Sequence, residues 1–197
     1  MHDVELSCRC GQVKGVAGPI DPAEGTRVVC YCKDCQAFAH ALGADRTVLD
    51  EYGGTDIYQL PPARVAIRQG QEQLRCLRLT EKGLFRWYAG CCNTPIGNTV
   101  SAGIPVVGLI HSFIADPATA QARLGPVKAY VNTGSAIGTL PAPVTHKSSM
   151  LGYVLKLVRK MLVWKLTGQG RPSPFFDDAG RPVCEPKILH PRRPPDR

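Results

Sequence analysis

Hydrophobic and polar positions in the first 130 residues form short runs separated by turn residues, the pattern of β-strands. Val4–Leu6 and Val13–Val16 flank an early cysteine pair, and Thr26–Val29 leads directly into a second cysteine group. Further apolar runs predict strands at residues 55–59, 65–68, 74–79, 84–88 and 106–110. The pattern predicts a mainly β fold, a compact and mostly antiparallel domain around one core.

Two segments show helical spacing instead. The stretch CKDCQAFAHALG at residues 32–43 ends on a glycine, which is a common helix stop. A second run of apolar residues at spacings of three and four extends over about 147–167, and its polar stripe is narrow and basic. We therefore predict a β domain over residues 1–135 and a C-terminal extension over 136–197, which consists of this amphipathic helix and an extended, Pro-rich tail.

Composition and charge narrow the class of protein. The 197 residues are 44% hydrophobic and 7% aromatic, which excludes wholesale disorder, collagen and coiled coil. Residues 1–146 hold 13 basic and 12 acidic side chains, a balance of +1, whereas residues 147–197 hold 11 and 4, a balance of +7. Because the basic character belongs to the C-terminal quarter, the β domain gives no sign of specific nucleic-acid binding.

The N-terminus points to a cytoplasmic protein. MHDVELSCRCGQ has neither the basic start nor the apolar core of a secretory signal, and the apolar stretch 150–166 is interrupted by four basic residues. Thiols are reduced in the cytosol, so the nine cysteines indicate metal binding or redox chemistry rather than a disulfide framework.

Five cysteines stand at metal-ligand spacings. Cys8 and Cys10 form a C-x-C pair, and the second group has the spacing C-x-C-x-x-C at Cys30, Cys32 and Cys35. Alternate side chains of a strand share a face, and a C-x-x-C turn brings two sulfurs around one ion. Because thiolates select zinc over hard cations, we expect zinc at the second group.

The number of ligands in the second group bears on its role. Three protein ligands with an open position are typical of catalytic zinc, and four are typical of structural zinc. His40 is five residues beyond Cys35 and is the nearest candidate for a fourth ligand, although a surface histidine is the better interpretation of its spacing.

Three motifs in order resemble the glutathione-dependent formaldehyde-activating enzyme (GFA) family, which includes centromere protein V. They are CRCGQV at residues 8–13, CYCKDC at residues 30–35 and RWYAGCCNTPI at residues 86–96. The resemblance implies an all-β fold of coiled antiparallel sheets, the β-tent. It also implies a structural zinc held by the first and last motifs and a second zinc, held by the middle motif, that acts on glutathione adducts.

Carried over by residue, Cys30, Cys32 and Cys35 match the second site fully, and Cys8 and Cys10 match half of the first. The last motif departs from the family, because its first cysteine falls on Ala89, its second on Cys92, and its usual glycine on Asn93. Cys91 is an extra sulfur that can serve only if the turn is rearranged, since neighbouring side chains of extended backbone point apart. The alternatives are a three-ligand site and apolar packing without metal.

The resemblance implies a carbon–sulfur lyase that acts on adducts of a small thiol, such as glutathione, with an aldehyde. Lys33 and Arg86 are candidates to receive a carboxylate of that thiol. Gln36 stands where the family commonly has a basic residue, a difference that concerns substrate identity. The alternative is a non-catalytic binding or chaperone module that zinc merely stabilises. No catalytic residue is assigned.

The helix at 147–167 has three interpretations. Packing against the β domain comes first, and peripheral membrane contact comes second, because the helix is basic and amphipathic. Self-association comes third.

Overall fold

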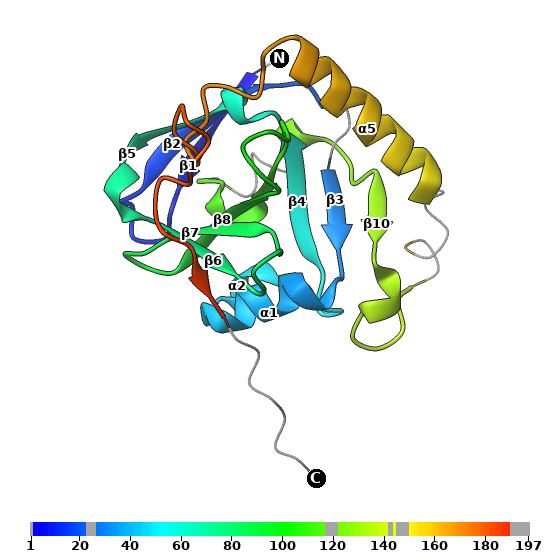
Figure 1. The fold of residues 1–197 in the computed structure, drawn as a ribbon. Helices are drawn as coiled ribbons and strands as arrows, with labels where there is room; N and C mark the ends of the chain where they lie inside the picture. The colour runs from blue at the N-terminus through cyan, green and yellow to red at the C-terminus, as the bar shows by residue number, and fades with distance from the viewer. Residues whose placement is uncertain (1, 23–26, 117–121, 142–143, 145–149, 190–197) are drawn as a thin grey trace.

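The computed structural model describes residues 2–22, 27–116, 122–141, 144 and 150–189. Within these residues the strands form a three-stranded sheet, ordered β1-β2-β5, and an eight-stranded sheet, ordered β10-β3-β4-β9-β8-β7-β6-β11. Figure 1 shows that the larger sheet is coiled, with β3, β4 and β10 crossing the direction of β6, β7 and β8. The prediction of a mainly β fold is confirmed.

The three-stranded sheet is antiparallel throughout. It contains β1 (His2–Ser7), β2 (Lys14–Ile20) and β5 (Val65–Gln69). In β1 the side chains of Val4 and Leu6 are buried, while Asp3 before them and Glu5 between them are exposed. This alternation is typical of a sheet with one face on the core, and it is the pattern that marked the strand in the sequence.

The eight-stranded sheet carries Cys30 and the turn with Cys91 and Cys92, whereas Cys8 and Cys10 follow β1 of the smaller sheet. The strands of the eight-stranded sheet, in spatial order, are β10 (Ala129–Val131), β3 (Arg27–Cys30), β4 (Thr55–Leu60), β9 (Val107–Ile110), β8 (Thr94–Thr99), β7 (Phe85–Ala89), β6 (Leu74–Arg78) and β11 (Lys187–Ile188). The pairs β10–β3 and β11–β6 at its two ends are parallel, and the inner pairs are antiparallel. Every residue of β8 is buried, so no polar alternation marks that strand in the sequence.

Helices α1 (Lys33–Ala41) and α2 (Asp45–Val48) lie together below β3 and β4 in the view of Figure 1. Phe38 of α1 packs with Val28, Ile57 and Ile110 in a second apolar cluster. The helix ends shortly before Gly43, whose φ of +63° is left-handed, as the sequence predicted for a helix stop. Short 3₁₀ helices occur at Pro62–Arg64, Gln71–Gln73, His111–Phe113 and Thr133–Ser135.

Helix α5 (Met150–Leu166) lies on the outside of the molecule, along the side where β10 and β3 are found (Figure 1). Residues 147–149 of the predicted helix are outside the described residues. In the part of the chain that the structure describes, no helix is both long enough and apolar enough to cross a membrane.

The segment after α5 packs back onto the β domain instead of extending from it as a tail. Phe175 and Phe176 are buried, with ring centroids 5.0 Å and 5.7 Å from that of Trp87. The sequence pattern missed this packing because two adjacent aromatic residues among prolines have neither helical nor strand periodicity. Residues 190–197 lie outside the described chain, and the domain boundary at 135 stays a prediction.

Candidate metal centres

The first centre joins two distant turns. Cys8 and Cys10 lie between β1 and β2, and Cys91 and Cys92 lie between β7 and β8. The four sulfur atoms all lie within 4.8 Å of one another. We call this group the four-sulfur cluster. It unites the C-x-C pair with both late cysteines, including the extra one.

The late turn has the rearranged form that two neighbouring ligands require. The backbone N–H groups of Cys92 and Asn93 both donate to the carbonyl of Ala89, at 3.3 Å and 2.8 Å, so the chain curls as in a helical turn. Asn93 then reverses the chain at a φ of +57°, a conformation that asparagine tolerates. The sulfurs of Cys91 and Cys92 come to lie 3.8 Å apart on one side.

The spacing of the sulfurs suits a tetrahedral thiolate-binding ion. Sγ of Cys91 lies 3.4 Å from Sγ of Cys10 and 3.8 Å from Sγ of Cys8, and the Cys8–Cys10 distance is 3.6 Å. A zinc–sulfur bond of about 2.3 Å implies an edge of roughly 3.8 Å between sulfurs in a tetrahedron. The donor set and the geometry both fit zinc, and four protein sulfurs leave no position for a substrate.

Hydrogen bonds at this cluster favour a thiolate at Cys92 and a protonated thiol at Cys91. Burial raises the pKa of Cys92, but hydrogen bonds to its sulfur from Thr94 and Cys10 outweigh burial and lower the pKa to about 6. The backbone N–H of Val13 donates to Sγ of Cys8 at 3.2 Å. Burial raises the pKa of Cys91, as do hydrogen bonds with Cys10 and Cys8. Neighbouring thiols thus share protons, which a bound cation would displace.

The second centre is local in the chain. Cys30 ends β3, Cys32 is the N-cap of α1, and Cys35 lies in the first turn of that helix. Their sulfurs also lie within 4.8 Å of one another, and we call them the three-sulfur cluster. The backbone N–H of Cys35 donates to Sγ of Cys32 at 3.3 Å. The N-terminus of α1 adds its partial positive charge, which stabilises thiolates.

Two side chains from distant strands also contact this cluster. Asn132, directly after β10, donates from Nδ2 to Sγ of Cys30 at 3.4 Å. Arg86 of β7 is only 1% exposed, and its Nη1 donates to Sγ of Cys35 at 3.8 Å and to Asn98 Oδ1 at 3.4 Å. Nη2 of Arg86 also lies 3.5 Å from a carboxylate oxygen of Asp34. A buried cation beside three sulfurs offsets the negative charge that they carry when ionised.

The three-sulfur cluster borders a cavity of about 260 Å³. Its polar lining includes Gln59, Arg86, Asn98 and Asn132, and its apolar lining includes Leu84 and Val106. Tyr153 of α5 donates a hydrogen bond to Gln59 Oε1, which ties the helix to the wall of the cavity. Small molecules of several heavy atoms fit such a volume.

Proton sharing is strong in the three-sulfur cluster. Hydrogen bonds from Cys32 and Cys35 lower the pKa of Cys30 to about 2, against the opposing effect of burial. The hydrogen bond with Cys30 is the largest cause that raises the pKa of Cys32, and it raises that of Cys35 as well. The three thiols therefore favour one thiolate held by two donors, and metal binding would release the remaining protons.

The other sequence candidates lie apart from the three sulfurs. His40 faces solvent, with Nδ1 4.0 Å from a carboxylate oxygen of Asp45, and Lys33 is exposed outside the cavity. Gln36 serves the fold, since its Nε2 donates to the carbonyls of Tyr31 and Ser135 at 2.9 Å each. Among the described residues, the metal-compatible grouping at this centre contains the three cysteines and no fourth ligand.

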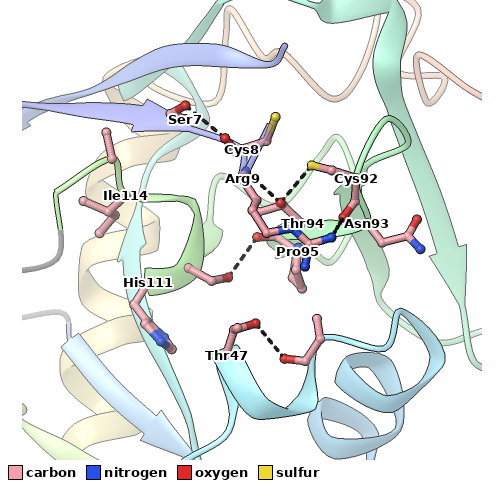
Figure 2. A pocket seen from close by; sticks show the side chains of 13 residues that line it. Ser7, Cys8, Arg9, Thr47, Cys92, Asn93, Thr94, Pro95, His111 and Ile114 are labelled. Atoms are coloured by element: carbon pink, nitrogen blue, oxygen red, sulfur yellow. Dashed lines mark hydrogen bonds between the residues drawn. The ribbon is translucent and has the colours of Figure 1, made fainter. Parts of the chain in front are cut away.

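A larger pocket, about 540 Å³, lies beside the four-sulfur cluster and is lined by Cys8, Arg9, Cys92 and His111, among others (Figure 2). Its hydrogen bonds hold the two cysteine turns together: the Arg9 backbone donates to Thr94 Oγ1 at 3.0 Å, and Arg9 Nη2 donates to the Cys92 carbonyl at 3.0 Å (Figure 2). The arrangement serves the cluster, and we assign no ligand to the pocket.

The family model of a family of unknown function, DUF6151, matches residues 1–187, which include both clusters and α5. The chain belongs to this family. Membership in DUF6151 assigns no activity. A crystal structure of a Rhodobacter sphaeroides protein is similar over 62% of this chain and 96% of that chain, with 14% identity and a TM-score of 0.41. No curated protein matches.

Proposed function

We propose that this DUF6151 protein binds zinc at both cysteine clusters. We propose further that the three-sulfur cluster serves a carbon–sulfur lyase reaction on adducts of a small thiol, such as glutathione, with an aldehyde. The observation that carries the proposal is that Cys30, Cys32 and Cys35 line a cavity and that no fourth protein ligand joins them among the described residues. The resemblance to the GFA family supports the same assignment, and the reduced cytoplasm is where such a thiol is abundant.

The reaction needs few groups from the protein. In an adduct RS–CH(OH)R′, the carbon–sulfur bond breaks, the hydroxyl oxygen loses its proton as it becomes the aldehyde carbonyl, and the sulfur leaves with the electron pair and accepts a proton. Zinc, when bound, supplies a Lewis-acid position that lowers the pKa of a thiol. The chain itself orients the adduct, and the Arg86 guanidinium in the cavity wall is the group suited to a substrate carboxylate.

A specific observation also favours the alternative, a zinc-stabilised binding or chaperone module. Cys30 and Cys35 are buried and belong to the apolar cluster around Phe38. A metal held there stabilises the packing of α1 on the sheet without any chemistry.

Zinc content tests the metal assignment. We expect two zinc ions per chain by elemental mass spectrometry, one of which is lost in Cys32→Ser and the other in Cys92→Ser. Cys184→Ser, which changes a partly buried cysteine outside both clusters, is the control and keeps two. If wild-type protein that is purified under zinc-replete, reducing conditions contains no zinc, the proposal is overturned.

A spectroscopic titration distinguishes the lyase hypothesis from the hypothesis that zinc only stabilises the fold. In protein loaded with Co²⁺, we expect reduced glutathione to change the cobalt absorption bands, and S-methylglutathione, whose sulfur carries no proton, to leave them unchanged. Cys32→Ser abolishes the response. Release of formaldehyde from S-hydroxymethylglutathione then tests the reaction. Bands that do not respond to any small thiol favour the scaffold.

A further inference from the structure

Helix α5 exposes a row of large apolar side chains to solvent. Leu155, Leu162 and Leu166 are 61%, 57% and 87% exposed. The exposed apolar set among the described side chains of this helix is Val154, Leu155, Val158, Leu162, Val163 and Leu166. At 100° per residue most of these positions fall on one side of the helix. A contiguous apolar surface of this kind marks an interaction site.

The fold does not need this row. The opposite side of α5 packs on the β domain: Trp164 is buried, and Tyr153, Leu157 and Met161 are partly buried. The helix therefore has two apolar faces, one turned inward and one turned outward. Figure 1 shows α5 with its outer side away from the other elements. The narrow polar stripe in the sequence is the result of these two faces.

Charge on the outward side selects the kind of partner. Lys156, Arg159 and Lys165 are exposed, and residues 150–166 contain no acidic side chain. Two copies of this helix placed face to face would bring these cations together without carboxylates to balance them. An anionic surface attracts the same cations and accepts the leucines between them.

We propose that α5 is an interfacial helix that binds an anionic lipid surface. The helix lies in the plane of the membrane, with Leu155, Leu162 and Leu166 inserted among the acyl chains near the headgroups and with Lys156 and Arg159 at the phosphate level. This surface function is independent of the chemistry proposed for the cysteine clusters.

Vesicle sedimentation of the full zinc-loaded chain tests this assignment. We expect binding to phosphatidylcholine vesicles that contain phosphatidylserine, at least tenfold weaker binding to phosphatidylcholine alone, and weakening of the anionic binding by salt. The double variant Leu155→Glu/Leu162→Glu should reduce binding to the anionic vesicles at least tenfold, because it removes two inserted side chains and adds repelled charges. Both positions are more than half exposed, so the fold and the zinc content should be preserved.

Two controls separate the site from general surface effects. Ile137→Glu changes a residue of similar exposure, 56%, outside the helix and should leave binding intact. Arg159→Glu should weaken binding, whereas Arg68→Glu on β5 should weaken it much less. The proposal would be overturned if wild-type protein did not bind anionic vesicles, or if the α5 double variant and the Ile137→Glu control lost vesicle binding equally. It would also be overturned if the protein formed a dimer that the double variant dissociates and showed no vesicle binding.

Discussion

The two cysteine clusters bring together residues that are separated by very different lengths of sequence. In the four-sulfur cluster, the contact between Cys10 and Cys91 spans 81 positions and connects the turns of two different sheets. The three-sulfur cluster is contained within residues 30–35 at the start of one helix. A metal at the first closes a long loop, while a metal at the second closes almost none. We therefore expect a metal at the four-sulfur cluster to contribute more to the stability of the fold than a metal at the three-sulfur cluster.

The largest expected effect comes from breaking the long-range cluster. Cys10→Ser should lower the free energy of unfolding of zinc-loaded protein by at least about 3 kcal/mol, since the crosslink between the two turns is lost. Cys32→Ser, which loses the other zinc, should cost less than Cys10→Ser, because serine still caps α1 and the remaining ligands lie in one short segment. Urea denaturation measures both. Equal losses in the two variants would remove the distinction between the clusters.

The next effect concerns Arg86, the buried cationic side chain beside the three-sulfur cluster. Arg86→Met should weaken zinc binding at that cluster by roughly 30-fold, about 2 kcal/mol, because the thiolates lose their neighbouring positive charge. The four-sulfur cluster should keep its affinity, and Arg68→Met, at an exposed position of β5, should change neither. Competition with a chromophoric chelator measures the two zinc ions separately. Weakening of both ions would indicate a general loss of structure.

A buried cysteine outside both clusters gives a prediction for how the stability of the protein depends on pH. Burial raises the pKa of Cys76 from 9.0 to about 12. Between these values the unfolded chain loses the thiol proton and the folded chain keeps it, so this residue makes stability fall as pH rises, with a limiting slope of about 1.4 kcal/mol per pH unit. In Cys76→Val, urea denaturation from pH 9 to 11 should show a shallower decline. Parallel declines would contradict the burial of this thiol.

The smallest expected effect comes from a matched pair of asparagines. Asn132 and Asn93 both have left-handed backbones, with φ of 56° and 57°, and glycine preserves that conformation. Asn132→Gly removes the donor to Cys30 and should weaken zinc binding at the three-sulfur cluster about fivefold, close to 1 kcal/mol. Asn93→Gly should leave both zinc affinities near wild type. The reverse ranking would place the important polar contact at the other cluster.

The sequence predicts the two clusters to different extents, because the ligands of one are close together in the sequence and those of the other are far apart. The spacing of Cys30, Cys32 and Cys35 is local, so chelation follows from the residues alone. The meeting of Cys8 with Cys92 came only from the family resemblance, and the role of Cys91 depends on the hydrogen bonds to Ala89, which no spacing reveals.

Other features were beyond the sequence because they depend on tertiary contacts. Asn132 lies 102 positions from Cys30, and no sequence spacing links the two. Arg86 was one of two basic candidates for this site, but the sequence did not show that it is buried beside Cys35. The central strand β8 lacks alternation because both of its faces are covered. Strands with one covered face and the helix that ends near Gly43 were predicted, since hydrophobic period and turn residues are local signals.

The packing of Phe175 and Phe176 on Trp87 has a consequence for how the protein is made. From residue 87 to residue 175 the ribosome adds 88 residues, which takes roughly 4 to 18 seconds at about 5–20 residues per second. Throughout that interval the nascent chain presents the tryptophan face of β7 without its aromatic cover. We therefore expect the growing polypeptide to be prone to aggregation between the synthesis of β7 and the arrival of this aromatic pair.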